Sequence, residues 1–136
     1  GHIFFKDRWY GFDDGLYSAA RLLEILTRAA DPSALLNSLP QSDSTPELQL
    51  DLKEGENVVL MDMLRRDAVF PGNEQIITID GLRVEYADGF GLARSSNTTP
   101  VIVMRFEAET PEALARIQGQ FKSVILAAKP DAILPF

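Results

Sequence analysis

The sequence predicts an α+β fold, in which a two-layer antiparallel sheet carries two helices on one face. Three observations support this prediction. Apolar residues recur with the two-residue period of strands and, in longer stretches, with the period of helices. From Thr45 onward the predicted elements follow the order strand, helix, four strands, helix. Short turns join the strands, so we expect an antiparallel sheet that both helices cover from one side.

The first 30 residues are predicted to form the end of a strand and one helix. Residues 3–5 are typical of a buried strand, and Asp13 or Asp14 can cap a helix that continues to about Ala29. The helix has a wide apolar face, formed by Leu16, Ala19, Ala20, Leu23, Ile25 and Leu26. One strand and one helix cannot bury such a face, so we interpret residues 1–30 as the tail of a larger α/β unit.

A polar stretch separates this tail from the rest of the chain. Asp31 and Pro32 predict a cap and a first-turn proline for a short helical turn that ends at Leu36. Residues 40–46 are polar and begin and end with proline, which is typical of a linker. We therefore expect a tail of a third domain at 1–30, a linker or hinge at 31–44 and a C-terminal domain at 45–136.

The C-terminal domain begins with a strand at 47–52, where leucines alternate with polar residues. A helix at 55–67 is expected to bury Val59, Leu60, Met63 and Leu64. Strands follow at 75–79, 82–86, 90–93 and 101–108, with turn signals at 80–81 and 88–89. A last helix begins at Thr110-Pro111 and ends before Pro130, and it buries Leu114, Ile117, Phe121, Val124, Ile125 and Ala128. The apolar tail at 134–136 is expected to pack on the core.

Composition argues against several classes of function. The 136 residues contain no cysteine, and His2 is the only histidine, so thiol-ligated metals, a zinc centre and a Ser-His-Asp triad are not expected. There is no run of 18 apolar residues, so we expect no membrane span. The net charge of -7, without a basic cluster, argues against nucleic-acid binding. We expect a cytoplasmic monomer.

The strongest chemical signal is the stretch from Arg94 to Pro100, which we call the 94–100 segment. It places a guanidinium, several hydroxyls, a carboxamide and backbone N–H groups between two apolar strands. Such donors can hold a phosphate or a carboxylate. The alternative is a polar turn whose side chains bond only to their own backbone.

The 94–100 segment, with Gly89-Phe90-Gly91 before it and Val101-Ile102-Val103 after it, resembles the phosphate-binding loop in the last domain of the α-D-phosphohexomutases. The closest branch is the bacterial phosphomannomutase/phosphoglucomutase branch, because phosphoglucosamine mutases usually carry a different loop. Residues 1–15 also resemble this family, in which they follow the sugar-recognition loop of the third domain.

The resemblance implies an enzyme that interconverts the 1-phosphate and 6-phosphate of mannose or glucose through a bisphosphorylated sugar. In the family, a phosphoserine in the first domain donates the phosphoryl group, and Mg²⁺ is bound in the second domain. The last domain has a TATA-binding-protein-like fold and holds the phosphate that does not react. The resemblance implies that Arg94, Ser96, Asn97 and Thr98 bind this phosphate, that Gly89 and Gly91 let the backbone approach it, and that Ser95 is a spacer.

The resemblance also implies that this chain is an inactive C-terminal fragment, because it lacks the phosphoserine and the ligands of Mg²⁺. Its partners would be a phosphosugar and the N-terminal domains of the same enzyme. His2 corresponds to a histidine near the reacting centre, or it is a remnant of cloning. We interpret Asp13 and Asp14 as a helix cap, and Trp9 and Tyr10 as residues that pack between domains or stack on a sugar. The rival hypothesis is a stand-alone protein-interaction module without a phosphosugar site.

Overall fold

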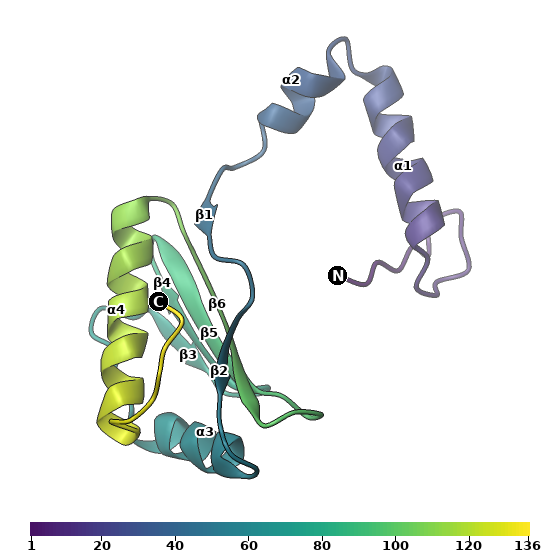
Figure 1. Cartoon of the computed structure of the whole chain (residues 1–136). Helices are drawn as coiled ribbons and strands as arrows, with labels where there is room; N and C mark the ends of the chain where they lie inside the picture. The colour runs from purple at the N-terminus through teal and green to yellow at the C-terminus, as the bar shows by residue number, and fades with distance from the viewer. The chain divides into compact units, whose positions relative to one another are not determined.

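A computed structural model describes residues 1–136 and contains two compact units, Gly1–Pro40 and Gln41–Phe136 (Figure 1). The first unit holds the helices α1 (Gly15–Arg28) and α2 (Pro32–Asn37). The second unit holds all the strands and the two remaining helices. No helix combines the length and the hydropathy that are needed to cross a lipid bilayer.

Both predicted caps in the first unit are confirmed. The carboxylate of Asp14 accepts a hydrogen bond from the Tyr17 N–H at 2.9 Å, and that of Asp31 accepts one from the Ala34 N–H at 3.0 Å. Of the predicted strand at residues 3–5, this chain shows only an isolated bridge that joins Phe4 to Asp13, and the Phe4 side chain is 63% exposed.

The apolar face of α1 is uncovered in this chain. The helix has no buried residue, and several large apolar side chains along it are exposed, namely Leu16, Leu22, Leu23 and Ile25. An uncovered face of this kind does not stabilise a helix by burial, so α1 depends on its cap and on local contacts. One such contact is the stacking of Trp9 on Tyr17, with ring centroids 4.3 Å apart.

The second unit is built on one antiparallel sheet of six strands. Strand β6 (Val101–Ala108) pairs with β5 (Gly89–Ser95) on one side, and β4 (Leu82–Tyr86) and β3 (Gln75–Ile77) continue the sheet in that direction. On its other side β6 pairs with β1 (Asp43–Ser44) and β2 (Leu48–Asp51). The predicted α+β class and the antiparallel sheet are confirmed.

Part of the segment that the sequence suggests as a linker belongs to this sheet. Asp43 and Ser44 pair with Ala108 and Glu107. The following residue, Thr45, exchanges two hydrogen bonds with Phe106: its N–H donates to the Phe106 carbonyl at 3.0 Å, and its hydroxyl accepts from the Phe106 N–H at 3.1 Å. Polar composition does not exclude strand pairing when a free strand edge lies alongside.

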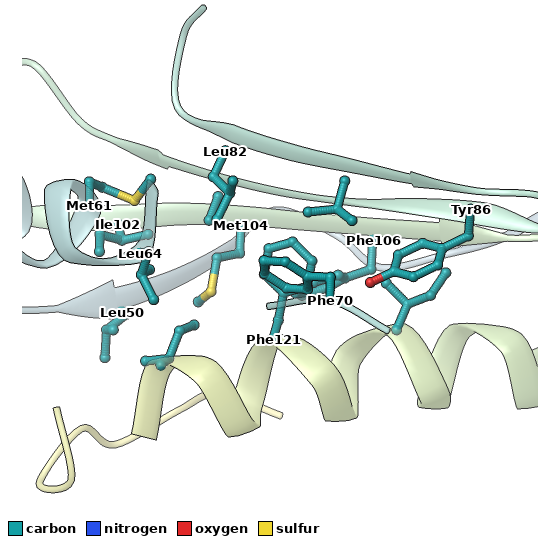
Figure 2. Close-up of a cluster of buried hydrophobic side chains, with 14 of the residues drawn as sticks. Leu50, Met61, Leu64, Phe70, Leu82, Tyr86, Ile102, Met104, Phe106 and Phe121 are labelled. Carbon is teal, nitrogen blue, oxygen red and sulfur yellow. The ribbon is translucent and has the colours of Figure 1, made fainter. Parts of the chain in front are cut away.

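The core lies between the sheet and the helices α3 (Glu56–Asp67) and α4 (Pro111–Ala128) (Figure 2). Alternate strand residues face the helices and are buried, among them Leu82, Val84, Ile102, Met104 and Phe106. The C-terminal tail closes the core, as predicted, with the Phe136 ring 5.1 Å from that of Phe106. Apolar burial of this kind is the main stabilising contribution to the unit.

The buried stripe of α3 differs from the prediction. The prediction that Val59 is buried is wrong, since its side chain is 61% exposed, and Met63 is only partly buried. The residues that face the sheet are Asn57, Leu60, Met61 and Leu64. These positions follow the helical spacing i, i+3, i+4, i+7, so a polar residue begins an otherwise apolar stripe.

Candidate functional site

Backbone hydrogen bonds hold the 94–100 segment at the end of the β5–β6 hairpin. The Ser96 N–H donates to the Val101 carbonyl at 3.0 Å, and the Val101 N–H donates to the Thr99 carbonyl at 2.8 Å. The Pro100 carbonyl accepts from the Leu52 N–H at 3.0 Å, which connects the segment to the end of β2. The two ends of the loop are therefore anchored to the sheet on both sides of β6.

The hydroxyl of Ser96 organises the middle of the segment. Its oxygen accepts from the N–H groups of Thr98 and Thr99, each at 3.3 Å, and lies 3.0 Å from the Thr99 hydroxyl. Backbone N–H groups can only donate, so Ser96 Oγ is an acceptor in these bonds, and it also lies 3.4 Å from the Thr98 hydroxyl. The self-capped turn that the sequence suggests as the alternative is thus part of the local structure. One hydroxyl of the Ser96–Thr98 pair donates to the other, so the pair keeps one hydrogen to donate.

Helix α3 contacts the segment through Asn57. Its side-chain nitrogen Nδ2 donates to Ser95 Oγ at 2.7 Å and to the Ser96 carbonyl at 3.3 Å. The residue is only 6% exposed. Sequence reasoning missed Asn57 and treated Ser95 as a spacer. A polar residue on the buried stripe of a helix was the available signal, because buried polar groups need partners.

A shallow groove of about 290 Å³ lies between the segment and the start of α3. Residues 95–100 form one side, and Glu54, Gly55, Asn57 and Val58 form the other. Ser96, Asn97 and Thr98 are thus brought together along one groove. The carboxylate of Glu54 is the charged group in this lining, and it disfavours an anion there.

Arg94 is not part of the lining of this groove. It pairs with Val103 across the sheet, so strand alternation places its side chain on the face away from the helices, opposite to Ser95. Arg94 is half-buried, and its guanidinium makes no hydrogen bond or ion pair. A guanidinium without a carboxylate partner keeps all its donors for a ligand.

Gly89 and Gly91 lie further back along β5 and are packed against protein. A Cβ at Gly91 would lie 2.3 Å from the Phe121 ring, and one at Gly89 would lie 2.4 Å from the Glu107 carbonyl oxygen. At about 3.3 Å per strand residue, Gly91 is roughly 10 Å from Arg94. Their close contacts are with α4 and β6, and the structure does not bring them to the groove.

The candidate residues of the first unit have protein partners. His2 Nδ1 forms a short hydrogen bond with Asp13 Oδ2, and the Trp9 indole donates to Asp14 Oδ2 at 3.1 Å. Tyr10 is 82% exposed. No group of three or more His, Asp or Glu side chains in residues 1–136 is placed to bind a metal ion.

Comparison with known proteins identifies similar chains. The family model of the phosphoglucomutase/phosphomannomutase C-terminal domain matches residues 47–124. A phosphoglucomutase of Neisseria meningitidis serogroup A is 61% identical over 99% of this chain, and a phosphomannomutase/phosphoglucomutase of Pseudomonas putida is 50% identical over 100% of it. This chain spans 29% of the length of each of these relatives.

A solved structure has the same fold. The crystal structure of a phosphoglucomutase/phosphomannomutase family protein from Burkholderia thailandensis matches 100% of this chain with a TM-score of 0.90 and 69% sequence identity. The match covers 28% of that protein.

Proposed function

Because the chain belongs to the phosphoglucomutase/phosphomannomutase family, as its C-terminal domain, we propose that it is the substrate-phosphate-binding part of a phosphohexomutase. The parent enzyme interconverts hexose 1-phosphate and hexose 6-phosphate of mannose or glucose through a bisphosphorylated sugar. In it, residues 1–30 belong to the preceding domain, the part of the 31–44 linker that precedes β1 acts as a hinge, and residues 45–136 hold the phosphate that is not reacting.

The free donors of the 94–100 segment carry this proposal. The Arg94 guanidinium is unpaired, the Asn97 carboxamide and the Thr98 side chain are exposed, and the Ser96 and Thr98 hydroxyls together keep one hydrogen to donate. A phosphate offers several acceptor oxygens, and a planar guanidinium binds two of them at once. Such a set of donors binds a dianion and performs no bond-breaking step.

The chemistry of the enzyme belongs to groups outside these residues. Nothing in residues 1–136 forms a site for Mg²⁺, so we propose that the metal of the parent enzyme is bound elsewhere and supplies charge stabilisation to the transferring phosphoryl group. The contribution of this domain is to grip one phosphate and to cover the cleft, which excludes water from the transfer. The chain by itself is expected to be inactive.

The isolated chain should bind a phosphosugar weakly. A charge-assisted hydrogen bond contributes about 1.5–3 kcal/mol, and ordering of an exposed loop and ligand offsets part of it. A few such bonds correspond to a dissociation constant on the order of millimolar.

A chemical-shift titration of the 136-residue chain with glucose 1-phosphate tests the proposal. We expect shifts that are concentrated at residues 94–99 and a millimolar Kd. Arg94→Ala should raise this Kd by about tenfold or more, since it removes the charge-assisted bonds. Arg105→Ala is the matched control, because Arg105 is an exposed arginine on the same face of the sheet, two residues from the partner of Arg94.

Two results would count against the proposal. One is the absence of any response of the wild-type chain at tens of millimolar glucose 1-phosphate. The other is an equal loss of affinity in the Arg94→Ala and Arg105→Ala variants, which would indicate attraction by general charge. Either result would favour the rival hypothesis of an interaction module.

A further inference from the structure

Asn57 is unusual among the buried residues of this chain. Apart from Tyr86, with its phenol hydroxyl, it is the only buried residue whose side chain carries a polar group, and all the other buried side chains along α3 are apolar. Burial of an amide is unfavourable unless its hydrogens find acceptors. The acceptors here both belong to the 94–100 segment, so the one buried polar contact of α3 is made to the candidate site.

The contact defines the orientation of the amide. A backbone carbonyl can only accept, so the group that contacts the Ser96 carbonyl at 3.3 Å must be the nitrogen of Asn57. The same nitrogen also donates to Ser95 Oγ at 2.7 Å. The amide nitrogen thus bonds to two consecutive residues, which restrains the backbone where β5 ends and the loop begins.

This restraint passes on to the donors of the loop. Ser96 is held from the α3 side through its carbonyl and from β6 through its N–H, which donates to the Val101 carbonyl at 3.0 Å. Its hydroxyl in turn receives the N–H groups of Thr98 and Thr99. A shift of the Ser96 backbone would therefore move its hydroxyl and the turn that carries Asn97 and Thr98.

We propose that Asn57 is a positioning residue for phosphosugar binding, which acts by holding Ser95 and Ser96 in the geometry that presents the Ser96, Asn97 and Thr98 donors. The inference rests on the phosphate-binding function proposed above. Asn57 makes no contact with the ligand in this account. Its effect is to order the loop before the ligand arrives, so that binding does not include the entropic cost of ordering it.

Substitution of Asn57 by leucine tests the role, because leucine has a similar size and suits the apolar stripe but cannot donate. Two quantities are measured on the 136-residue chain: hydrogen exchange of the Thr98 and Thr99 amides without ligand, and the Kd of glucose 1-phosphate. We expect exchange at both amides to become about tenfold faster and the Kd to rise about tenfold. Exchange in the core of β6 should stay as in the wild type.

Two further variants separate positioning from general stability. Val59→Ala removes apolar atoms from an exposed position of the same helix and should change neither quantity. Ser95→Ala removes one of the two acceptors of Asn57, so it should weaken binding less than Asn57→Leu does. Addition of Ser95→Ala to Asn57→Leu should have little further effect, because the two side chains act through one contact.

The outcomes are distinguishable. If hydrogen exchange at the Thr98 and Thr99 amides is as slow in Asn57→Leu as in the wild type, the inference is overturned, whatever Kd is measured for glucose 1-phosphate. It is also overturned if exchange becomes faster while the Kd is unchanged, because the order of the loop would then not matter for binding. Failure of the wild-type chain itself to bind would instead overturn the proposed function, and with it the premise of the inference.

Discussion

A glycine in the neighbouring turn packs closely against Arg94. Gly81 lies between β3 and β4 with a φ of +106°, and its carbonyl accepts a hydrogen bond from Arg65 of α3 at 3.2 Å. A Cβ at this position would lie 2.4 Å from the Ala93 carbonyl oxygen and 2.7 Å from the Cβ of Arg94. The turn therefore packs directly against the residue that we expect to grip the phosphate.

Gly81→Ala should weaken both the fold and the site. The new methyl group would push against Arg94 while the backbone is held in a left-handed conformation, so we expect a loss of about 3 kcal/mol in the free energy of unfolding. Displacement of Arg94 should also raise the Kd of glucose 1-phosphate several-fold. Urea denaturation and the chemical-shift titration measure the two effects.

Gly72→Ala is the control for the backbone effect alone. Gly72 also has a positive φ, +77°, but a Cβ there would meet no atom within 4 Å. We expect it to cost about 1 kcal/mol and to leave the Kd unchanged. Equal effects of the two substitutions on both measurements would contradict the packing role of Gly81.

Among the elements, α4 and the sheet are joined by a hydrogen bond at the edge of the core. The Tyr86 hydroxyl on β4 donates to Oε1 of Gln120 on α4 at 2.6 Å, and Tyr86 is only 5% exposed. Burial raises the pKa of the Tyr86 phenol to about 12, although the nearby Arg116 guanidinium partly opposes this effect. The folded chain thus keeps this phenol protonated at a pH where an unfolded tyrosine ionises.

Stability should therefore fall at high pH through Tyr86. The pKa of Tyr86 in the folded chain lies above its value of about 10 in the unfolded chain. The stabilisation that the protonated phenol provides is therefore fully present below pH 10 and is lost as the pH approaches 12. The free energy of unfolding, measured by urea denaturation at pH 8, 10 and 11, should decline less with rising pH for Tyr86→Phe than for the wild type. Tyr10→Phe is the control, since Tyr10 is exposed, and it should follow the wild type. Identical declines of all three proteins would contradict this assignment.

At the scale of the whole molecule, the spacing of apolar residues and the turn-forming residues predicted most elements of the second unit. Leucine alternation at 48, 50 and 52 and the turn signals at 80–81 and 88–89 are local features, and local features determine strands and hairpins. The caps at Asp14 and Thr110 are local as well, and both form. The order and type of the elements from β2 onward could therefore be inferred from the chain alone.

What the sequence could not predict depends on contacts between distant residues. Asn57 and Ser95 are 38 positions apart, and only the packing of α3 on β5 brings them together. The same holds for Gly81 and Arg94, and for the close approach of Gly91 to Phe121. Strand pairing by Asp43 and Ser44 was missed because polar, proline-flanked residues indicate a linker unless a free edge is known to lie beside them.

The central claim is that the 94–100 segment holds the phosphate of a phosphosugar, and the position of the phosphorus atom tests it most directly. A crystal structure of the chain with glucose 1-phosphate bound should place phosphate oxygens at about 2.7–3.2 Å from the Arg94 guanidinium and from the Ser96, Asn97 or Thr98 donors. A phosphate bound elsewhere in the second unit, for example at Lys53 and Lys129, with the 94–100 segment unoccupied, would contradict the account.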